Sequence, residues 1–226
     1  AKSGSGALAL DRLYPAATLD VGATAAVLTI TGVGSATTLK WVGDGAANAW
    51  DTTTANWSPF TYADGYPVLF DDTGSASPAV TITPAPVAPA LVQVNASSKS
   101  YTFSGAGITG TCSLVKSGTA NLTLNSANAY SGQTAVNAGT LTLNGQLSNS
   151  CVVVAFGATL NQGALGRIDG AAVSVTNFGT LTLAGTNRYD GMTVVGVLGI
   201  SNNTLNVNSP YALGSTANGT IINGGS

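Results

Sequence analysis

The chain of 226 residues carries a formal net charge of −2, contains no histidine and is only 7% charged, whereas charged residues make up about 25% of ordinary globular domains. So weak a charge excludes the basic surface that nucleic acid or an anionic membrane would require, and the lack of histidine excludes a serine–histidine nucleophile. Two cysteines cannot supply a zinc site of four thiolates, and the sequence has no run of roughly 18 apolar residues to cross a membrane. Its many threonines and valines favour strands over helices.

Residues 1–36 are expected to form an N-terminal arm followed by a strand pair. The segment 1–20 is small and polar and then mixed, which is typical of an extended arm. The clearest strand pattern is Ala26-Val-Leu-Thr-Ile30, where β-branched and aliphatic side chains predominate. We expect the arm to take part in self-association.

Residues 37–99 are expected to form a β cap rich in tryptophan and proline. They hold all three tryptophans, Trp41, Trp50 and Trp57, and six of the eight prolines. Aromatic bulk suits the closure of one end of a repeat array, because terminal units differ from the others. The same aromatic side chains could instead stack against sugars.

Aspartates gather in this cap. Five of the nine lie close together in the sequence: Asp44, Asp51, Asp64, Asp71 and Asp72. Carboxylate oxygens suit a hard cation such as Ca²⁺, although the spacing matches no calcium loop, and Asp-Gly and Asp-Thr-Gly phrases are typical of turns. Turn formation is therefore the favoured interpretation, and calcium is the only cofactor that the sequence suggests.

A short phrase repeats from about residue 100 to residue 226. Leu122, Leu141, Leu160 and Leu181 follow one another at a nearly constant interval, each shortly after a glycine. Alternation in Leu-Thr-Leu puts leucine on one side of a strand and threonine on the other. The predicted core therefore consists of Leu122, Leu124, Leu141, Leu143, Leu160, Leu181 and Leu183.

A unit of about 19–21 residues is too short to bury its own apolar side, so copies must stack. The length fits one coil of a parallel β-helix, with neighbouring strands about 4.8 Å apart. No catalytic residues are predicted anywhere in this array.

The segment from Ser117 to Leu143 resembles the autotransporter-associated β-strand repeat, and its Tyr130-Ser-Gly-Gln-Thr-Ala-Val136 phrase returns as Tyr189-Asp-Gly-Met-Thr-Val-Val195. The tryptophan-rich stretch from Trp41 to Trp57 resembles the leader that often precedes such repeats. The resemblance implies an all-β fold, a right-handed parallel β-helix (solenoid) with an aromatic-rich N-terminal β cap. It also implies an extracellular or cell-surface protein of a bacterium, and it brings no catalytic residues.

Two Arg-x-Asp-Gly phrases occur, one with Arg167 and Asp169 and the other with Arg188 and Asp190. They are separated by one repeat, so we expect arginine and aspartate to stack on their counterparts in the next coil. The favoured interpretation is a turn with a surface ion pair. The alternative is a glycan-binding or glycan-cleaving face.

Cys112 and Cys151 occupy equivalent places, each six positions before a repeat glycine and two repeats apart. Two coils separate their backbones by about 9.6 Å, whereas a disulfide requires less than about 7 Å. Yet extracellular proteins seldom keep free thiols. A distorted coil with an intrachain Cys112–Cys151 bridge is the favoured expectation, with free or interchain thiols as the alternatives.

Threonine also suggests an ice-binding face, which needs two threonine columns on a flat surface. Thr123, Thr142 and Thr182 form one outward column that Asn161 interrupts. The sequence interpretation therefore disfavours ice binding.

The segment Gly219-Thr-Ile-Ile-Asn-Gly-Gly-Ser226 has the pattern of the start of another coil. An open coil exposes backbone groups that recruit a further strand. We therefore expect a non-enzymatic extracellular structural protein that self-associates head to tail, through the solenoid ends and the arm, into a surface filament or sheath. The alternatives are a monomeric passenger or stalk segment of a larger adhesin, continuing beyond Ser226, and a glycan-binding or glycan-cleaving β-helix.

Overall fold

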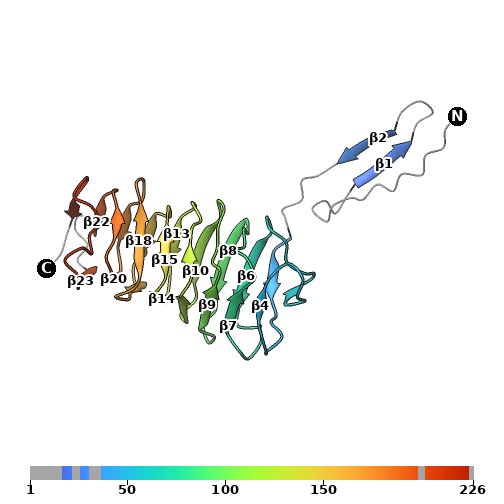
Figure 1. Ribbon diagram of the computed structural model, residues 1–226, viewed down its shortest axis with the longest axis horizontal. Coiled ribbons are helices and arrows are strands. Elements are labelled where there is room, and N and C mark those ends of the chain that lie inside the picture. Colours follow the sequence, from blue (N-terminus) through green and yellow to red (C-terminus); the bar gives the residue numbers. More distant parts are fainter. Residues whose placement is uncertain (1–16, 22–25, 31–36, 198–201, 224–226) are drawn as a thin grey trace. The chain divides into compact units, whose positions relative to one another are not determined.

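The computed structural model describes residues 17–21, 26–30, 37–197 and 202–223 (Figure 1). The chain divides into two compact units, residues 1–37 and 38–226. In the first unit, β1 (Ala17–Val21) and β2 (Ala26–Ile30) pair as a two-stranded antiparallel sheet. The strand expected at residues 26–30 is therefore confirmed, whereas most of the expected arm, residues 1–16, lies outside the described residues.

The second unit consists of three sheets of stacked strands. Sheet 1 contains β3 (Leu39–Trp41), β5 (Trp57–Ser58), β6 (Pro67–Asp71), β8 (Leu91–Asn95), β10 (Ser113–Ser117), β13 (Thr134–Val136), β16 (Val152–Val154), β19 (Val175–Asn177), β22 (Thr193–Val195) and β24 (Thr220–Ile222). Sheet 2 contains β4 (Ala49–Trp50), β7 (Ala79–Ile82), β9 (Tyr101–Gly105), β11 (Asn121–Leu124), β14 (Thr140–Leu143), β17 (Thr159–Gln162), β20 (Thr180–Leu183) and β23 (Thr204–Val207). Sheet 3 contains β12 (Ala127–Asn128), β15 (Gln146–Ser148), β18 (Arg167–Gly170) and β21 (Arg188–Tyr189).

Each coil passes from a strand of sheet 1 to a strand of sheet 2, and from β10 onward also through sheet 3 until β21. Figure 1 shows the strands of successive coils side by side. Neighbouring strands in these sheets are parallel except β5, which runs antiparallel to β3. The prediction of an all-β parallel solenoid is therefore confirmed. Within the described residues there is no helix, and so none that could span a bilayer.

The leucine spacing corresponds directly to the strand register. Leu122 pairs with Leu141, Leu141 with Leu160, and Leu160 with Leu181. The column continues to Leu205 on β23. All seven leucines of the predicted core are fully buried, because alternate residues of each strand point into the coil.

The segment from Asn128 to Thr134 and its counterpart from Asn187 to Thr193, here called the corner phrases, each form a corner between sheet 3 and sheet 1. The Asn128 side chain accepts a hydrogen bond from the Ile108 amide at 3.0 Å and donates one to the Gln146 carbonyl at 3.4 Å. These partners belong to the preceding and the following coil. Asn187 makes an equivalent pair of bonds in its own corner. Each asparagine therefore ties three coils together from inside, where an unpaired polar group would be costly.

An aromatic cluster fills the N-terminal end of the solenoid. Trp41 and Trp57 contact edge to face with ring centroids 5.0 Å apart, and Trp50 contacts Phe103 at 5.8 Å. Phe70 lies between these layers, 4.6 Å from Phe103. Sheets 1 and 2 continue without a break past residue 100. The cap and the repeats therefore share one core.

Candidate functional site

The five aspartates of the cap are distributed over four turns, with Asp71 and Asp72 together at the turn after β6. Each carboxylate accepts hydrogen bonds from backbone amides: Ala46 and Asn48 for Asp44, Thr53 and Thr54 for Asp51, Ala88 for Asp64, Thr73 for Asp71, and Ser97, Ser98 and Lys99 for Asp72. Across residues 37–197 and 202–223, no three metal-binding side chains lie close enough to hold an ion. The structure therefore does not assemble the calcium site that the sequence suggested.

Asp72 illustrates what these carboxylates do instead. Its two oxygens accept the amides of Ser97, Ser98 and Lys99 at 2.9–3.1 Å, which joins the turn after β6 to the turn after β8. The bonds from Ser97 and Ser98 favour the charged form and hold the pKa of Asp72 at about 2. The carboxylate thus stabilises two stacked turns.

Cys112 and Cys151 are both free thiols, so the expected intrachain disulfide is wrong. Leu114, Thr134 and Val152 share one register position in three successive coils. Cys112 lies two residues before Leu114, whereas Cys151 lies one residue before Val152. Cys112 is buried, and Cys151 is partly exposed. Because successive residues of a strand point to opposite sides, the two thiols lie on opposite sides of the coil wall, with a further coil between them. Burial raises the pKa of the Cys112 thiol to about 11.

Charged residues gather on the outside of sheet 3, here called the charged face. Arg167 forms an ion pair with Asp169 at 2.8 Å, and Gln146 donates a hydrogen bond to the same carboxylate oxygen at 2.9 Å. Arg188 is exposed and lies in register with Asp169. The expectation that the two Arg-x-Asp-Gly phrases stack residue on residue is therefore wrong.

The offset arises on the way from sheet 2 to sheet 3. Thr159 pairs with Thr180, and Asp169 pairs with Arg188. Asp169 lies ten residues after Thr159, whereas Arg188 lies eight residues after Thr180, so the second coil has two residues fewer between these register positions and its phrase is shifted by two residues. All three tryptophans are buried in the cap, so they offer no stacking surface for a sugar beside these charges.

The outside of sheet 1 is apolar over its C-terminal half. The apolar face consists of a column of outward residues in register: Val115, Ala135, Val153, Val194 and Ile221, with Thr176 between the third and fourth. At its margin Phe156, which is 49% exposed, stacks on Phe178 with ring centroids 5.6 Å apart. These side chains give the solenoid a lateral surface with little affinity for water.

The outside of sheet 2 forms the threonine face, which has two parallel columns. One column contains Asn121, Thr140, Thr159, Thr180 and Thr204, and the other contains Thr123, Thr142, Asn161, Thr182 and Asn206. The single column expected from the sequence is therefore wrong. Each Thr-Leu-Thr strand presents both of its threonines on the same outer side. No position of either column carries a charge.

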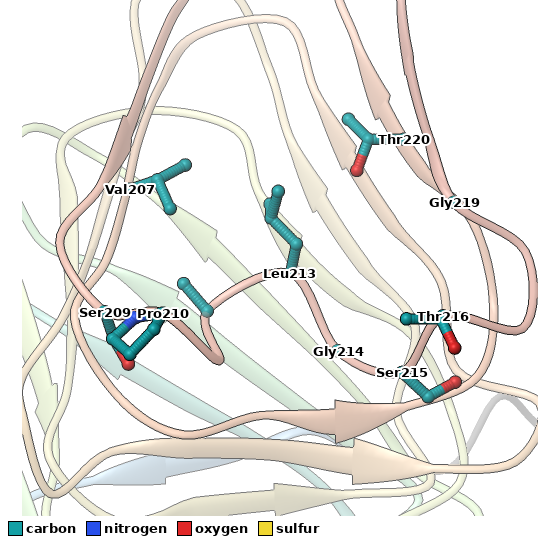
Figure 2. A pocket seen from close by; sticks show the side chains of 10 residues that line it. Val207, Ser209, Pro210, Leu213, Gly214, Ser215, Thr216, Gly219 and Thr220 are labelled. Carbon is teal, nitrogen blue, oxygen red and sulfur yellow. The ribbon is translucent and has the colours of Figure 1, made fainter.

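The last described coil is apolar. A hollow of about 410 Å³ is lined by uncharged side chains that include Val207, Pro210 and Leu213 (Figure 2). Tyr211 is 64% exposed and Ile222 is 67% exposed. β23 and β24 are the outermost described strands of sheets 2 and 1. Exposed apolar residues beside the outermost described strands make this coil the strongest candidate interaction site.

Lys116 is a buried polar residue that the sequence interpretation missed. It occupies an inward position of β10, in register with Val136. Its ammonium group donates to the carbonyls of Ser117, Gly118 and Ala138 at 3.1, 2.8 and 3.1 Å. Burial lowers the pKa of Lys116. The alternating pattern of this strand could have predicted the burial of Lys116, because Lys116 lies two residues after the inward Leu114.

Comparison with known proteins identifies the repeat. The model of the passenger-associated-transport-repeat family matches residues 114–143 and 176–197, which contain the two corner phrases that end in Thr134 and Thr193. Neither the curated proteins nor the solved structures gave a match. The two matched segments and the parallel solenoid fit a protein that carries autotransporter-associated β-strand repeats.

Proposed function

We propose that the chain is a non-enzymatic, extracellular structural segment of a bacterial surface protein, and that it self-associates head to tail into a filament or sheath. The repeat match supports the passenger-type structural role. The observation that supports self-association most strongly is the apolar edge of the last described coil, where Ile222 is 67% exposed.

A structural role is supported by the bonds between coils. Inward leucine columns such as that from Leu122 to Leu205 continue through neighbouring strands, and Asn128 and Asn187 link the coils on either side of them. The carboxylates of the cap bind turn amides, as at Asp72, and that of Asp169 binds arginine. Contacts of this kind between neighbouring coils and turns make the solenoid stiff, as a structural role requires.

Association is supported by the chemistry of the last coil. β23 and β24 are the outermost described strands of sheets 2 and 1, and an outermost strand offers backbone N–H and C=O groups that another strand can pair with. Burial of an exposed valine or isoleucine side chain contributes about 1.5–3 kcal/mol. Val207, Ile221 and Ile222 are available for such burial, and the uncharged hollow offers no repulsion to a second copy.

The N-terminal unit provides the matching element of a second copy. Among the described residues, β1 and β2 form a two-stranded sheet, and a sheet of two strands alone is marginally stable. Addition of this hairpin to the edge formed by β24 would extend sheet 1. Because such a contact joins two different surfaces, each copy retains one of each and the assembly propagates.

The experiment is size-exclusion chromatography with light scattering, together with negative-stain electron microscopy, on four forms of the full chain. Ile222→Lys places a charge on the apolar edge of the last described coil, and Val153→Lys places one on the apolar face. Leu165→Lys is the matched control, because Leu165 is 87% exposed and lies on a turn away from both surfaces. The wild type, Val153→Lys and Leu165→Lys should form fibres, whereas Ile222→Lys should remain monomeric.

Other outcomes separate the parts of the proposal. Loss of fibres only in Val153→Lys would assign the contact to the apolar face and overturn the head-to-tail arrangement. A wild-type chain that stays monomeric at micromolar concentration would overturn self-association altogether. The chain would then be a monomeric stalk segment.

A further inference from the structure

The threonine face differs from the other outer faces in its regularity. Thr140, Thr159, Thr180 and Thr204 occupy the same register position in four successive coils. The interruption at Asn161 falls in the other column only. The face therefore has one continuous threonine column with a mixed threonine–asparagine column beside it.

The hydroxyl groups of the continuous column are available to solvent. In the part of the chain that the structure describes, none of these four hydroxyls forms a hydrogen bond with another protein group. In the second column, by contrast, Thr142 donates to Asn121 at 3.0 Å and Asn206 donates to Thr182 at 3.2 Å. The continuous column consequently has to satisfy its hydroxyls with water.

The register fixes the spacing of these hydroxyls in two directions. Neighbouring parallel strands lie about 4.8 Å apart, and residues two apart on a strand lie about 6.6 Å apart. The first of these repeats is close to an oxygen spacing on a prism face of ice, and the second is somewhat shorter than the other spacing of that face. β-Branched threonine is restricted at χ1, so its methyl and hydroxyl groups are already ordered before any contact is made.

We infer that the threonine face binds ice, with the ordered water on its two columns joining the crystal surface. Charged groups orient water around themselves and would interrupt such a lattice. The two columns contain none, whereas the charged face carries Arg167, Asp169 and Arg188. The face also has no aromatic side chain on which a sugar ring could stack, which favours ice over a polysaccharide.

The test compares two substitutions within a single coil. Thr180→Tyr puts a bulky side chain in the middle of the threonine face. Thr176→Tyr puts the same side chain on the outside of sheet 1, where Thr176 also lies between two strands. Thr159→Lys is a second variant on the threonine face. Each full-length variant is checked for native secondary structure by circular dichroism.

Thermal hysteresis and incorporation into a growing ice hemisphere are measured for each protein. The wild type and Thr176→Tyr should widen the gap between melting and freezing and should enter the ice. Thr180→Tyr and Thr159→Lys should lose both effects. The inference is overturned if the wild type is excluded from ice, or if folded Thr159→Lys or Thr180→Tyr retains full activity. Loss in Thr176→Tyr as well would also overturn it, because the effect would then not belong to this face.

Discussion

The hydroxyl groups of Tyr130 and Thr134 lie 2.7 Å apart in the interior of the solenoid, and the Thr134 hydroxyl lies 2.8 Å from that of Ser150. All three side chains are buried. The second corner phrase has the same contact, at 2.7 Å, between Tyr189 and Thr193. These hydrogen-bonded hydroxyls therefore fix the corner from inside, and burial raises the pKa of Tyr130 so that its hydroxyl stays neutral.

Thr134→Val should lower the free energy of unfolding by about 1–3 kcal/mol, because valine has the same shape but leaves the buried Tyr130 hydroxyl without its partner. Thr176→Val is the control, since this outward threonine should change stability by less than about 0.5 kcal/mol. Urea denaturation followed by circular dichroism measures both. Equal effects of the two substitutions would contradict the role assigned to the Tyr130–Thr134 contact.

Gly132→Ala should destabilise the chain more than Gly157→Ala. A Cβ atom at Gly132 would lie 2.2 Å from the Cys112 carbonyl oxygen, a backbone atom of the preceding coil. At Gly157 no atom lies within 4 Å, but φ is +75°, so alanine there costs about 1–2 kcal/mol from backbone strain alone. The comparison uses the same denaturation assay. A milder effect at Gly132 would mean that the coils can separate there without loss.

Asp72 should make the chain less stable in acid. Its pKa of about 2 in the folded chain lies below the ordinary value of 3.8, so its contribution is present above about pH 4 and is lost as the pH falls toward 2. Asp72→Asn should therefore reduce stability at pH 7 and flatten the decline between pH 4 and pH 2. Denaturation midpoints at pH 7, 4 and 2 measure this, and parallel pH profiles for both proteins would argue against the turn contact.

Cys112 and Cys151 should both titrate as free thiols in the unfolded chain. In the folded chain, Cys151 should react with an alkylating reagent while Cys112 is protected, because Cys112 is buried and its pKa is raised to about 11. Mass spectrometry of native and denatured samples without reductant counts the labels. Absence of labelling in the denatured protein would indicate a bridge and contradict the register.

The leucine core could be predicted from the sequence because Leu122, Leu141 and Leu160 recur at a nearly constant interval, and constant spacing implies constant register. Where a turn changes length, spacing no longer gives the register. The shorter path from Thr180 to Arg188 shifts the second Arg-x-Asp-Gly phrase by two residues, which a comparison of the phrases alone does not reveal.

The predictions of a disulfide and of a single threonine column failed because of differences of one residue position. A difference of one residue in the turn lengths placed Cys112 inside and Cys151 outside. The second threonine column, with Thr140, Thr159 and Thr180, lies at the position before each leucine, whereas the predicted column lies at the position after it. Turn hydrogen bonds such as those of Asp72 are set by neighbouring coils, so their partners could not be assigned before the stack was known.

Sedimentation velocity of the full chain over a range of concentrations tests the central claim most directly. If the last coil of one copy accepts the hairpin of another, the weight-average sedimentation coefficient should rise with concentration in the wild type and stay constant in Ile222→Lys. A wild-type chain that sediments as one 22.2 kDa species at every concentration would contradict head-to-tail association.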